Sequence, residues 1–415
     1  MFRAFLILLL AGTLASCAGS RSGLNSGTLQ SLLASRDYFT MRERLIRMSG
    51  SPDRLVAEAA VLNAFNQPAA SNEAIDRLLA SSEVDDELRL ELTRIQRANF
   101  IRLHRFDDAY RAAREALLLP PNSAEKRRDD QNIEIFLRAL RDVAPQTAVI
   151  GGTSEVRPDS AGHYPILING HTRAFALDTG ANFSVLMRSE AAALGLEIRP
   201  AGFQVGTSTD INMLADVAIA DSVRIGSVRY RNVVFLVFND RALTFPNEFE
   251  IRGLIGFPLI EAMREVHFLE DGSLQIPARP VVPAVGNLAL DGLDPLIQVR
   301  WRRSDLICRL DSGANKTAFY EPFYRRFKVI IDRTGEPHRS QTGGVGGVRE
   351  FDVRVLPRTR ITVGTRTVHL EDVRVHVEPL LADEKNYLDC NVGRDVLEQF
   401  GEYALNFESM SLVLR

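Results

Sequence analysis

The sequence predicts a multidomain α plus all-β protein, with an α-helical N-terminal region followed by a β region made of two similar lobes. Between residues 29 and 145, apolar residues recur three and four positions apart and helix-forming residues dominate. From Tyr164 onward, short runs rich in Val, Ile and Phe are interrupted by turn residues, which is typical of β-strands. The motif LDTGAN at residues 177–182 returns as LDSGAN at residues 310–315, which indicates that the β region is duplicated.

Composition sets the outer limits of the fold and of its partners. The chain has 415 residues, of which 45% are hydrophobic and 25% are charged, so it can form two or three domains with their own apolar cores. Its formal net charge of −3 gives no indication of a nucleic-acid partner.

The first sixteen residues have the pattern of a secretory signal peptide. Arg3 precedes an apolar stretch at residues 5–10 that is too short to span a bilayer, and small residues follow. The sequence LASC at residues 14–17 resembles the bacterial lipobox, so Cys17 is expected to be lipidated and to anchor the protein in the cell envelope, facing the periplasm, with the outer membrane favoured over the inner. The alternative is an ordinary signal peptide with a chance cysteine. Residues 17–28 contain many Ser and Gly residues and are expected to form a flexible tether.

The helical region at residues 29–145 contains two similar pieces, which start at Ala64 and Asn99. Their offset of 35 residues, with Ala74 and Ala109 in equivalent positions, resembles the period of tetratricopeptide repeats. Two hypotheses remain open for this region. It forms either a docking surface for a protein partner or substrate, or a helical spacer between the membrane and the β region.

The β region divides into lobe 1, residues 150–282, and lobe 2, residues 286–415, at a proline-rich boundary. Asn169 and Gly170 between two apolar runs predict a tight hairpin of type I′. Each LDTGAN-like motif is followed by a later glycine that comes directly after an apolar residue, Gly256 at 78 residues after Asp178 in lobe 1 and Gly393 at 82 residues after Asp311 in lobe 2. A single Asp-Thr/Ser-Gly triplet could be a surface turn, but two copies with matched spacing favour a duplicated functional site.

These motifs resemble those of the aspartic proteases, in a fused two-lobe bacterial form. The alanine after each triplet is the retropepsin version, and the NVGRDVLEQF sequence near the C-terminus resembles the retropepsin helix that begins with Gly-Arg-Asp/Asn. Lobe 2 also carries a glycine-rich stretch at residues 342–353 that resembles the retropepsin flap, whereas lobe 1 has one glycine in that position and no arginine after Gly256. The flap candidates are Gly206, Gly343, Gly344, Gly346 and Gly347.

The resemblance implies that Asp178 and Asp311 form a catalytic dyad. One carboxylate activates a water molecule while the other, protonated carboxyl polarises the peptide carbonyl, and two adjacent carboxyls share a proton because they cannot both ionise readily. A fused duplication can supply both aspartates from one chain. The expected supporting residues are Thr179 and Ser312, which would hydrogen-bond across the lobes, and Gly180 and Gly313, which let the backbone approach the carboxyls.

The remaining cysteines and histidines give weaker signals. Cys308 and Cys390 could pair or remain as two thiols, and we favour buried thiols. His369 and His376 are expected on the surface, on either side of a β-hairpin, and no histidine spacing indicates a metal site.

The function expected from the sequence is therefore that of an exported, membrane-anchored aspartic endopeptidase. It would act on a protein or peptide substrate without a cofactor or metal. The alternative is a non-catalytic peptide-binding or scaffold protein that keeps the fold.

Overall fold

The computed structural model describes residues 29–48, 52–80, 84–121, 123–206, 213–244, 250–344, 347–380 and 386–415. The predicted signal peptide, the tether and the lipidation site at Cys17 lie outside the described residues. Within the described ranges, none of the helices has both the length and the apolar character needed to cross a membrane.

The N-terminal region is helical, as the apolar spacing predicts. Asp85 and Ser123 cap two of its helices by accepting hydrogen bonds from the backbone N–H groups of Leu88 and Lys126. The equivalent alanines of the two similar pieces are fully buried, so small side chains let neighbouring helices pack closely. The helices are α1 (Leu29–Ala34), α2 (Tyr38–Leu45), α3 (Pro52–Ala64), α4 (Pro68–Leu79), α5 (Asp86–Arg102), α6 (Phe106–Leu118) and α7 (Ala124–Leu140).

The strands of lobe 1 form an eight-stranded sheet that closes on itself through an additional pairing of β7 with β8. Asn169 and Gly170 both have positive φ values, 45° and 86°, which confirms the predicted hairpin between β3 and β4. The sheet has the order β1 (Thr147–Ile150), β8 (Val228–Phe238), β5 (Ser184–Met187), β9 (Gly253–Ile255), β4 (His171–Leu177), β3 (Tyr164–Ile168), β7 (Met213–Ile225) and β6 (Ile198–Val205). Lobe 1 also contains α8 (Arg188–Ala193), the short 3-10 helix η1 (Asp240–Leu243) and α9 (Phe257–Glu261).

The strands of lobe 2 form a second eight-stranded sheet, which is closed by a pairing of β13 with β17. Two helices accompany it, α10 (Glu321–Thr334) and α11 (Arg394–Leu397). The sheet has the order β12 (Leu288–Asp291), β13 (Asp294–Trp301), β14 (Ser304–Leu310), β19 (Cys390–Val392), β15 (Ala318–Phe319), β18 (Arg366–His376), β17 (Gly347–Val363) and β16 (Glu336–Gly344).

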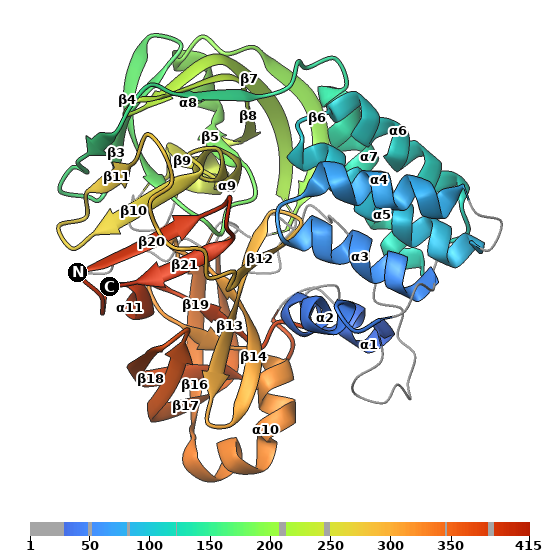
Figure 1. The fold of residues 1–415 in the computed structure, drawn as a ribbon. Coiled ribbons are helices and arrows are strands. Elements are labelled where there is room, and N and C mark those ends of the chain that lie inside the picture. The colour runs from blue at the N-terminus through green and yellow to red at the C-terminus, as the bar shows by residue number, and fades with distance from the viewer. Residues whose placement is uncertain are drawn as a thin grey trace.

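A five-stranded sheet joins the two lobes, with the order β2 (Ser154–Val156), β11 (Leu274–Ile276), β10 (Glu265–Leu269), β20 (Glu402–Asn406) and β21 (Ser411–Leu414). Its central pairing brings β10 of lobe 1 against β20 from the C-terminus of the chain. The two lobes lie one above the other, with this sheet between them (Figure 1). The fold is therefore a helical region followed by a bilobal acid-protease β fold, which confirms the predicted fold class.

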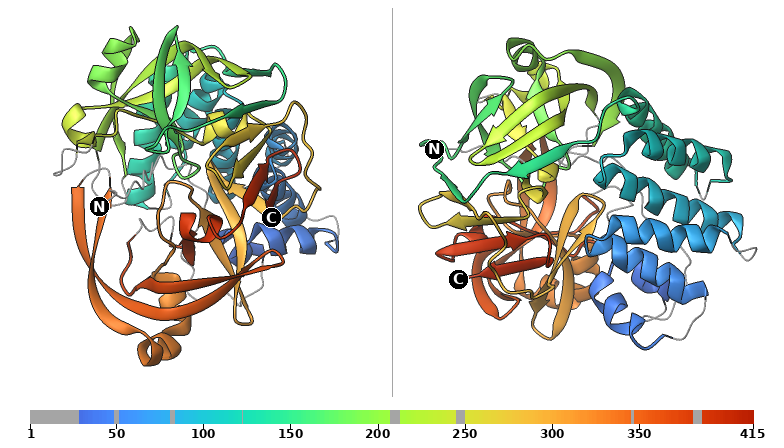
Figure 2. Two further views of the ribbon diagram at one scale, coloured as in Figure 1. Left: turned by 90° about the vertical axis from the view of Figure 1, so that its left-hand side faces the viewer. Right: turned by 45° about the horizontal axis from the view of Figure 1, so that its top comes forward.

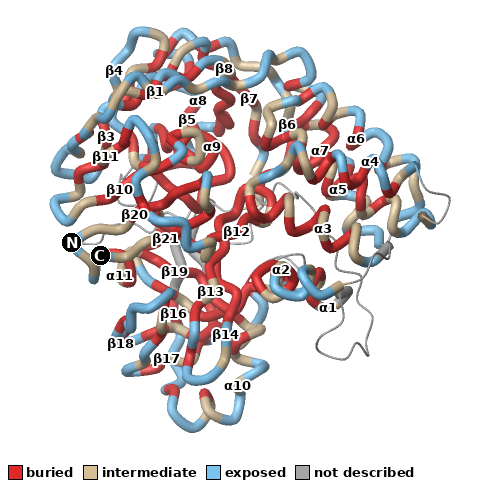
Figure 3. The backbone as a smooth tube through the Cα atoms, viewed as in Figure 1, coloured by how far each residue is buried: buried red, intermediate tan, exposed pale blue. Residues whose placement is uncertain are grey.

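The helical region packs on both lobes rather than standing apart from them, and it flanks both in two views (Figures 1 and 2). On the lobe 2 side, Tyr38 Oη donates to Asp291 Oδ1 at 3.1 Å. On the lobe 1 side, Phe136 of α7 contacts the rings of Phe183 and Phe203, with centroids 5.2 and 4.9 Å away. Buried residues lie along the inner strands of the lobes and on the helix faces turned toward them (Figure 3). These contacts hold the helical region against both lobes.

The preference for free thiols at Cys308 and Cys390 is wrong, because the two residues form a disulfide. The strands β14 and β19 run parallel, and their register places Cys308 directly opposite Cys390, with Cα atoms 4.6 Å apart. That separation lies in the range a disulfide spans.

The expectation for the histidines is also wrong in part. His369 and His376 both lie on β18 and do not flank a hairpin. His369 is exposed, but His376 is buried between the rings of Phe351 and Tyr320. The two histidines are seven residues apart on a twisted strand, and Phe351 and Tyr320 cover only the end that carries His376. Their side chains therefore have different environments.

Candidate active site

Asp178 and Asp311 occupy equivalent positions, each immediately after a strand that ends inside its lobe. The backbone N–H of Asp178 donates to Ile255 O at 2.9 Å, and that of Asp311 donates to Val392 O at 3.0 Å. Their side chains are 1% and 0% exposed. The same strand pairing therefore holds each aspartate at the centre of the molecule.

The two carboxyl groups meet because each lies over the glycine of the opposite loop. A Cβ atom built on Gly313 would lie 2.4 Å from Cγ of Asp178, and one built on Gly180 would lie 2.7 Å from Cγ of Asp311. A real side chain at either position would collide with the opposite carboxyl. The glycines of the two motifs are thus required by the close approach of the two loops.

The neighbouring hydroxyl residues link the loops across the lobe interface. Thr179 N–H donates to Ser312 Oγ at 3.0 Å, and Ser312 N–H donates to Thr179 Oγ1 at 3.0 Å. The Thr179 hydroxyl in turn donates to Leu310 O at 3.1 Å. This reciprocal pair fixes the relative position of the two aspartates.

A second layer of hydroxyl groups holds each loop against its own lobe. Ser184 Oγ accepts the N–H of Gly256, and Thr317 Oγ1 accepts the N–H of Gly393, both at 3.1 Å. The correspondence between the lobes therefore extends beyond the motifs themselves.

The environment of Asp178 favours its neutral form. Burial raises the pKa of Asp178 well above its ordinary value, and the adjacent Asp311 raises it further, whereas Arg309 and the Gly180 N–H act in the opposite direction. Two buried carboxyls in contact share one proton over a range of pH. Such a pair can supply an acid and a base at the same time.

A cavity of about 560 Å³ opens beside the dyad. It is bordered by Asp178 from lobe 1 and by Ser312 and Gly313 from lobe 2, so a molecule bound in it would contact both lobes. Further lining residues are His163, Tyr164, Arg252, Phe268, Arg394 and Tyr403. This mixture of aromatic and charged groups suits a peptide, which has both apolar and polar parts.

Four of the flap candidates, Gly206, Gly343, Gly344 and Gly347, lie in the described ranges. Gly206 directly follows β6, and Gly343, Gly344 and Gly347 lie where β16 turns into β17, with Gly344 paired to Gly347. Gly346 lies outside the described residues. Their role in covering a substrate stays a prediction.

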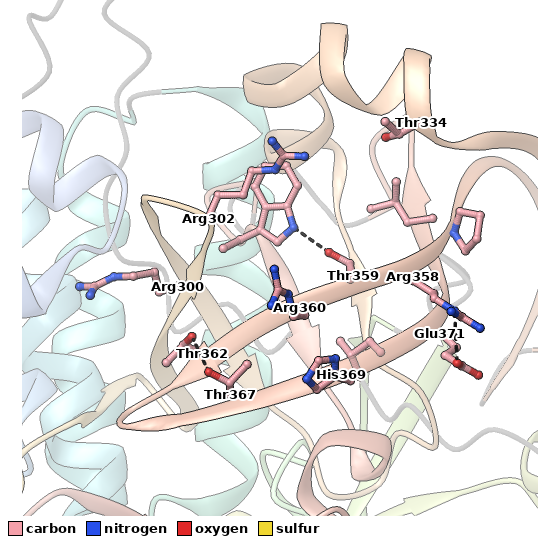
Figure 4. A pocket seen from close by; sticks show the side chains of 14 residues that line it. Arg300, Arg302, Thr334, Arg358, Thr359, Arg360, Thr362, Thr367, His369 and Glu371 are labelled. Carbon is pink, nitrogen blue, oxygen red and sulfur yellow. Dashed lines mark hydrogen bonds and ion pairs between the residues drawn. The ribbon is translucent and has the colours of Figure 1, made fainter.

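A larger hollow of about 1070 Å³ lies on the outer surface of lobe 2 and does not include the dyad. Arg300, Arg302, Arg358 and Arg360 line it (Figure 4). Trp301 is a further lining residue. Exposed carboxylates already pair with two of these arginines, Asp305 with Arg300 and Glu371 with Arg358. Among the described residues, no group of three or more His, Cys, Asp or Glu residues could hold a metal ion.

The motif search missed two polar residues that contact the dyad loops, Arg309 and Asn391. The Arg309 guanidinium donates to Gly180 O, and Asn391 Nδ2 donates to Asp311 Oδ2 at 2.9 Å. Neither belongs to the Asp-Ser-Gly triplet. A comparison of the two lobes residue by residue could have found them, since lobe 1 has Ala176 and Leu254 at the equivalent positions.

Two buried carboxyls, Asp178 and Asp311, are thus held at the junction of the two β lobes. Residues 164–259, which include Asp178, match a family described as aspartyl protease. The chain is similar to a retropepsin-like aspartic protease from Rickettsia conorii, with 20% identity and a TM-score of 0.22, over 32% of this chain and 91% of that one. Basic 7S globulin from soybean is 7% identical with a TM-score of 0.38, over 65% of this chain and 94% of its own.

A further similar structure is the EIAV protease complexed with the inhibitor HBY-793. It is 23% identical with a TM-score of 0.19, over 26% of this chain and 86% of its own. Among curated proteins, none matches this chain.

Proposed function

We propose that the protein is an exported, membrane-anchored aspartic endopeptidase whose dyad, Asp178 and Asp311, forms within one chain. The observation that carries this proposal is the contact of each carboxyl with the glycine of the opposite loop. The aspartyl protease match of residues 164–259 supports the reaction class. A protein or peptide chain lying in the cavity beside the dyad is the proposed substrate.

The proposed chemistry needs one shared proton. The ionised carboxyl takes a proton from a water molecule while the oxygen of that water attacks the carbonyl carbon of the peptide bond. The protonated carboxyl donates its proton to the carbonyl oxygen. The resulting diol then collapses, and the leaving amine receives the proton first taken from water. No cofactor or metal enters these steps.

The test is digestion of casein or a peptide library from acidic to neutral pH. Asp178→Asn and Asp311→Asn should each abolish cleavage, because each removes half of the dyad. Substantial activity in either single variant would refute the proposal. Binding of a peptide without cleavage by the native protein would favour the alternative of a non-catalytic peptide-binding or scaffold protein.

A mixing experiment tests whether the dyad is intramolecular. Equal amounts of the Asp178→Asn and Asp311→Asn variants should stay inactive together if both carboxyls come from one chain. Recovered activity would instead indicate that lobes pair between two chains.

The proposed location in the bacterial cell envelope rests on the sequence of residues 1–17. The disulfide between Cys308 and Cys390 supports export, because such bonds persist in oxidising compartments. Incorporation of labelled palmitate into the native protein and its loss in Cys17→Ser would support the lipid anchor. Equal labelling of both would refute it.

For the helical region, we propose a tetratricopeptide-like docking surface for a protein partner on the side turned away from the lobes. The 35-residue offset between its two similar pieces supports this idea. Cross-linking in intact cells, compared with a variant carrying charge reversals on exposed α6 residues such as Arg111→Glu, tests it. Identical cross-linked partners would refute it.

A further inference from the structure

The duplication provides an internal comparison at the two residues that flank each dyad strand. In lobe 1, Ala176 of β4 pairs with Leu254 of β9, and in lobe 2, Arg309 of β14 pairs with Asn391 of β19. Two apolar positions beside Asp178 thus correspond to a cation and an amide beside Asp311. The dyad is symmetric in its backbone but not in its surroundings.

Arg309 lies beneath the junction of the two loops. It is 1% exposed, and its guanidinium donates to Gly180 O across the lobe interface. A Cβ atom on Gly180 would lie 2.6 Å from Nη2 of Arg309 and 2.7 Å from Cγ of Asp311, so the cation and the carboxyl share this small space. Ala176 brings no charge to the corresponding place in lobe 1.

Asn391 completes a set of donors around Asp311. Its Nδ2 donates to Asp311 Oδ2 at 2.9 Å, and the backbone N–H groups of Gly313 and Ala314 donate to Oδ1 at 3.0 and 2.9 Å. Such bonds are stronger when the acceptor carries a charge.

Asp178 has fewer donors. Its Oδ1 accepts the N–H of Gly180 at 2.7 Å, while its buried Oδ2 accepts no hydrogen bond from an N–H or hydroxyl group of the described residues and has only the Asp311 carboxyl beside it. The N–H of Ala181 donates to the backbone oxygen of Asp178, whereas the equivalent N–H of Ala314 donates to both the backbone oxygen and Oδ1 of Asp311. An oxygen without donors is better satisfied when it carries a proton and donates it.

We propose that Arg309 and Asn391 assign the two roles in the dyad: Asp311 carries the negative charge and acts as the base, and Asp178 holds the proton and acts as the acid. This inference rests on the proposed peptidase function. In the reaction, Asp311 takes the proton from water and later gives it to the leaving amine. Asp178 protonates the carbonyl oxygen and recovers a proton when the diol collapses.

The other ionisable groups around Arg309 are compatible with this assignment. Asp294 Oδ1 lies 3.3 Å from Arg309 Nε and offsets part of its charge. Although burial opposes a charge on Arg309, Asp294 and Asp311 keep its pKa above the ordinary value. Tyr320 also faces this group, and burial raises its pKa, so it stays neutral in the working range.

The first experiment places the residue of one lobe at the equivalent position of the other, at Asn391 and Leu254, and measures the pH profile of kcat/KM. Asn391→Leu removes a hydrogen-bond donor from Asp311 and should move the acidic limb to higher pH by about one unit. The reason is that the free energy of one hydrogen bond to a charged group corresponds to a pKa change of about that size. Leu254→Asn gives Asp178 a donor and should move the alkaline limb to lower pH. An acidic limb that stays in place in Asn391→Leu would overturn the role of Asn391.

A second pair of variants tests Arg309. The double variant Arg309→Met with Asp294→Asn removes the buried cation and its partner together. The acidic limb should then move to higher pH further than the alkaline limb, because Arg309 interacts more strongly with Asp311 than with Asp178. Arg309→Lys keeps the charge and should keep both limbs near their original pH. Arg300→Ala, which removes an exposed arginine of the same lobe, is the matched control and should leave the profile unchanged. Unmoved limbs, or equal shifts of both limbs, in the double variant would overturn the role of Arg309.

A spectroscopic titration without substrate separates this inference from the proposed function. With aspartate carboxyls labelled with ¹³C, and the two dyad signals assigned by their loss in the Asp→Asn variants, Asp311 should be ionised over the pH range in which Asp178 is protonated. The reverse order, or equal ionisation of both, would overturn the assignment. Absence of peptidase activity would refute the proposed function while this titration still decides the protonation order, even if an exchanged variant fails to fold.

Discussion

Thr179 and Ser312 exchange hydrogen bonds across the lobe interface, each backbone N–H donating to the other residue's hydroxyl at 3.0 Å. The two residues are 133 positions apart in the chain. Since each directly follows a dyad aspartate, any slip between the lobes would separate the carboxyls and break these bonds together. The geometry of the site and the association of the lobes therefore depend on the same contacts.

Thr179→Val removes the hydroxyl while keeping the shape of the side chain. It leaves the buried Ser312 N–H and Leu310 carbonyl without their partner, so the free energy of unfolding should fall by about 1–3 kcal/mol. The value of kcat should fall at least tenfold, because the carboxyls lose their register. Urea unfolding and peptide cleavage measure the two effects. Thr179→Ser keeps the hydroxyl and serves as control, and native kcat in the Val variant would contradict the prediction.

The repeated motif made the position of the dyad predictable, because a short local pattern encodes the loop and the duplication supplies its partner. The hairpin at Asn169 was predictable for the same local reason. The Cys308–Cys390 bond was not, since it depends on the parallel register of β14 and β19, which joins segments 82 residues apart. Arg309 was not predicted, because in the sequence an arginine next to a motif is typical of an exposed position. Its burial depends on contacts with the other lobe.

The burial of His376 and the sheet shared by both lobes follow from tertiary packing in the same way. Alternation along β18 predicts a face, but only the neighbouring rings of Phe351 and Tyr320 decide that this face is covered. Likewise, the strand pattern near the C-terminus predicts β20 without indicating that it pairs with β10 of the other lobe.

Phe136 of α7 links the helical region to the loop that follows Asp178 and to strand β6 of lobe 1. Its ring contacts Phe183, five residues after Asp178, and Phe203 of β6, and the neighbouring Asn132 exchanges hydrogen bonds with the Gln204 backbone at 2.6 and 2.7 Å. Phe136→Ala should lower the free energy of unfolding by about 3–5 kcal/mol. It should also raise KM, because the Phe183 loop and β6 lose a common support.

The matched control for Phe136→Ala is Leu118→Ala in the same region. Leu118 is 83% exposed, so its removal should change stability by less than about 0.5 kcal/mol and leave KM unchanged. Thermal unfolding and peptide-cleavage kinetics compare the two variants. A native KM in a folded Phe136→Ala protein would show that α7 does not support the site.

Cys308→Ser with Cys390→Ser removes the disulfide that ties β14 to β19. The bond closes a loop of 82 residues, so its loss should lower the free energy of unfolding by about 2–4 kcal/mol. Arg309 and Asn391 directly follow the two cysteines on these strands and are paired with each other. Loss of the disulfide should therefore disturb their contacts with the dyad loops, so kcat should fall as well. Reduction of the native protein with dithiothreitol should reproduce both effects, whereas equal stability of the oxidised and reduced forms would contradict the prediction.

His376 should make the fold less stable in acid. Burial lowers the pKa of His376 to about 4 from its ordinary value of 6.5, with a smaller contribution from Arg374. The unfolded chain therefore binds more protons than the folded one between these values, so stability is retained above pH 6.5 and is lost as the pH falls toward 4. From pH 7 to pH 4.5 this amounts to about 2–3 kcal/mol. His376→Phe keeps a ring between Phe351 and Tyr320 but cannot bind a proton, so urea unfolding at the two pH values should show a smaller acid loss by that amount. An equal acid loss in both proteins would mean that His376 does not set it.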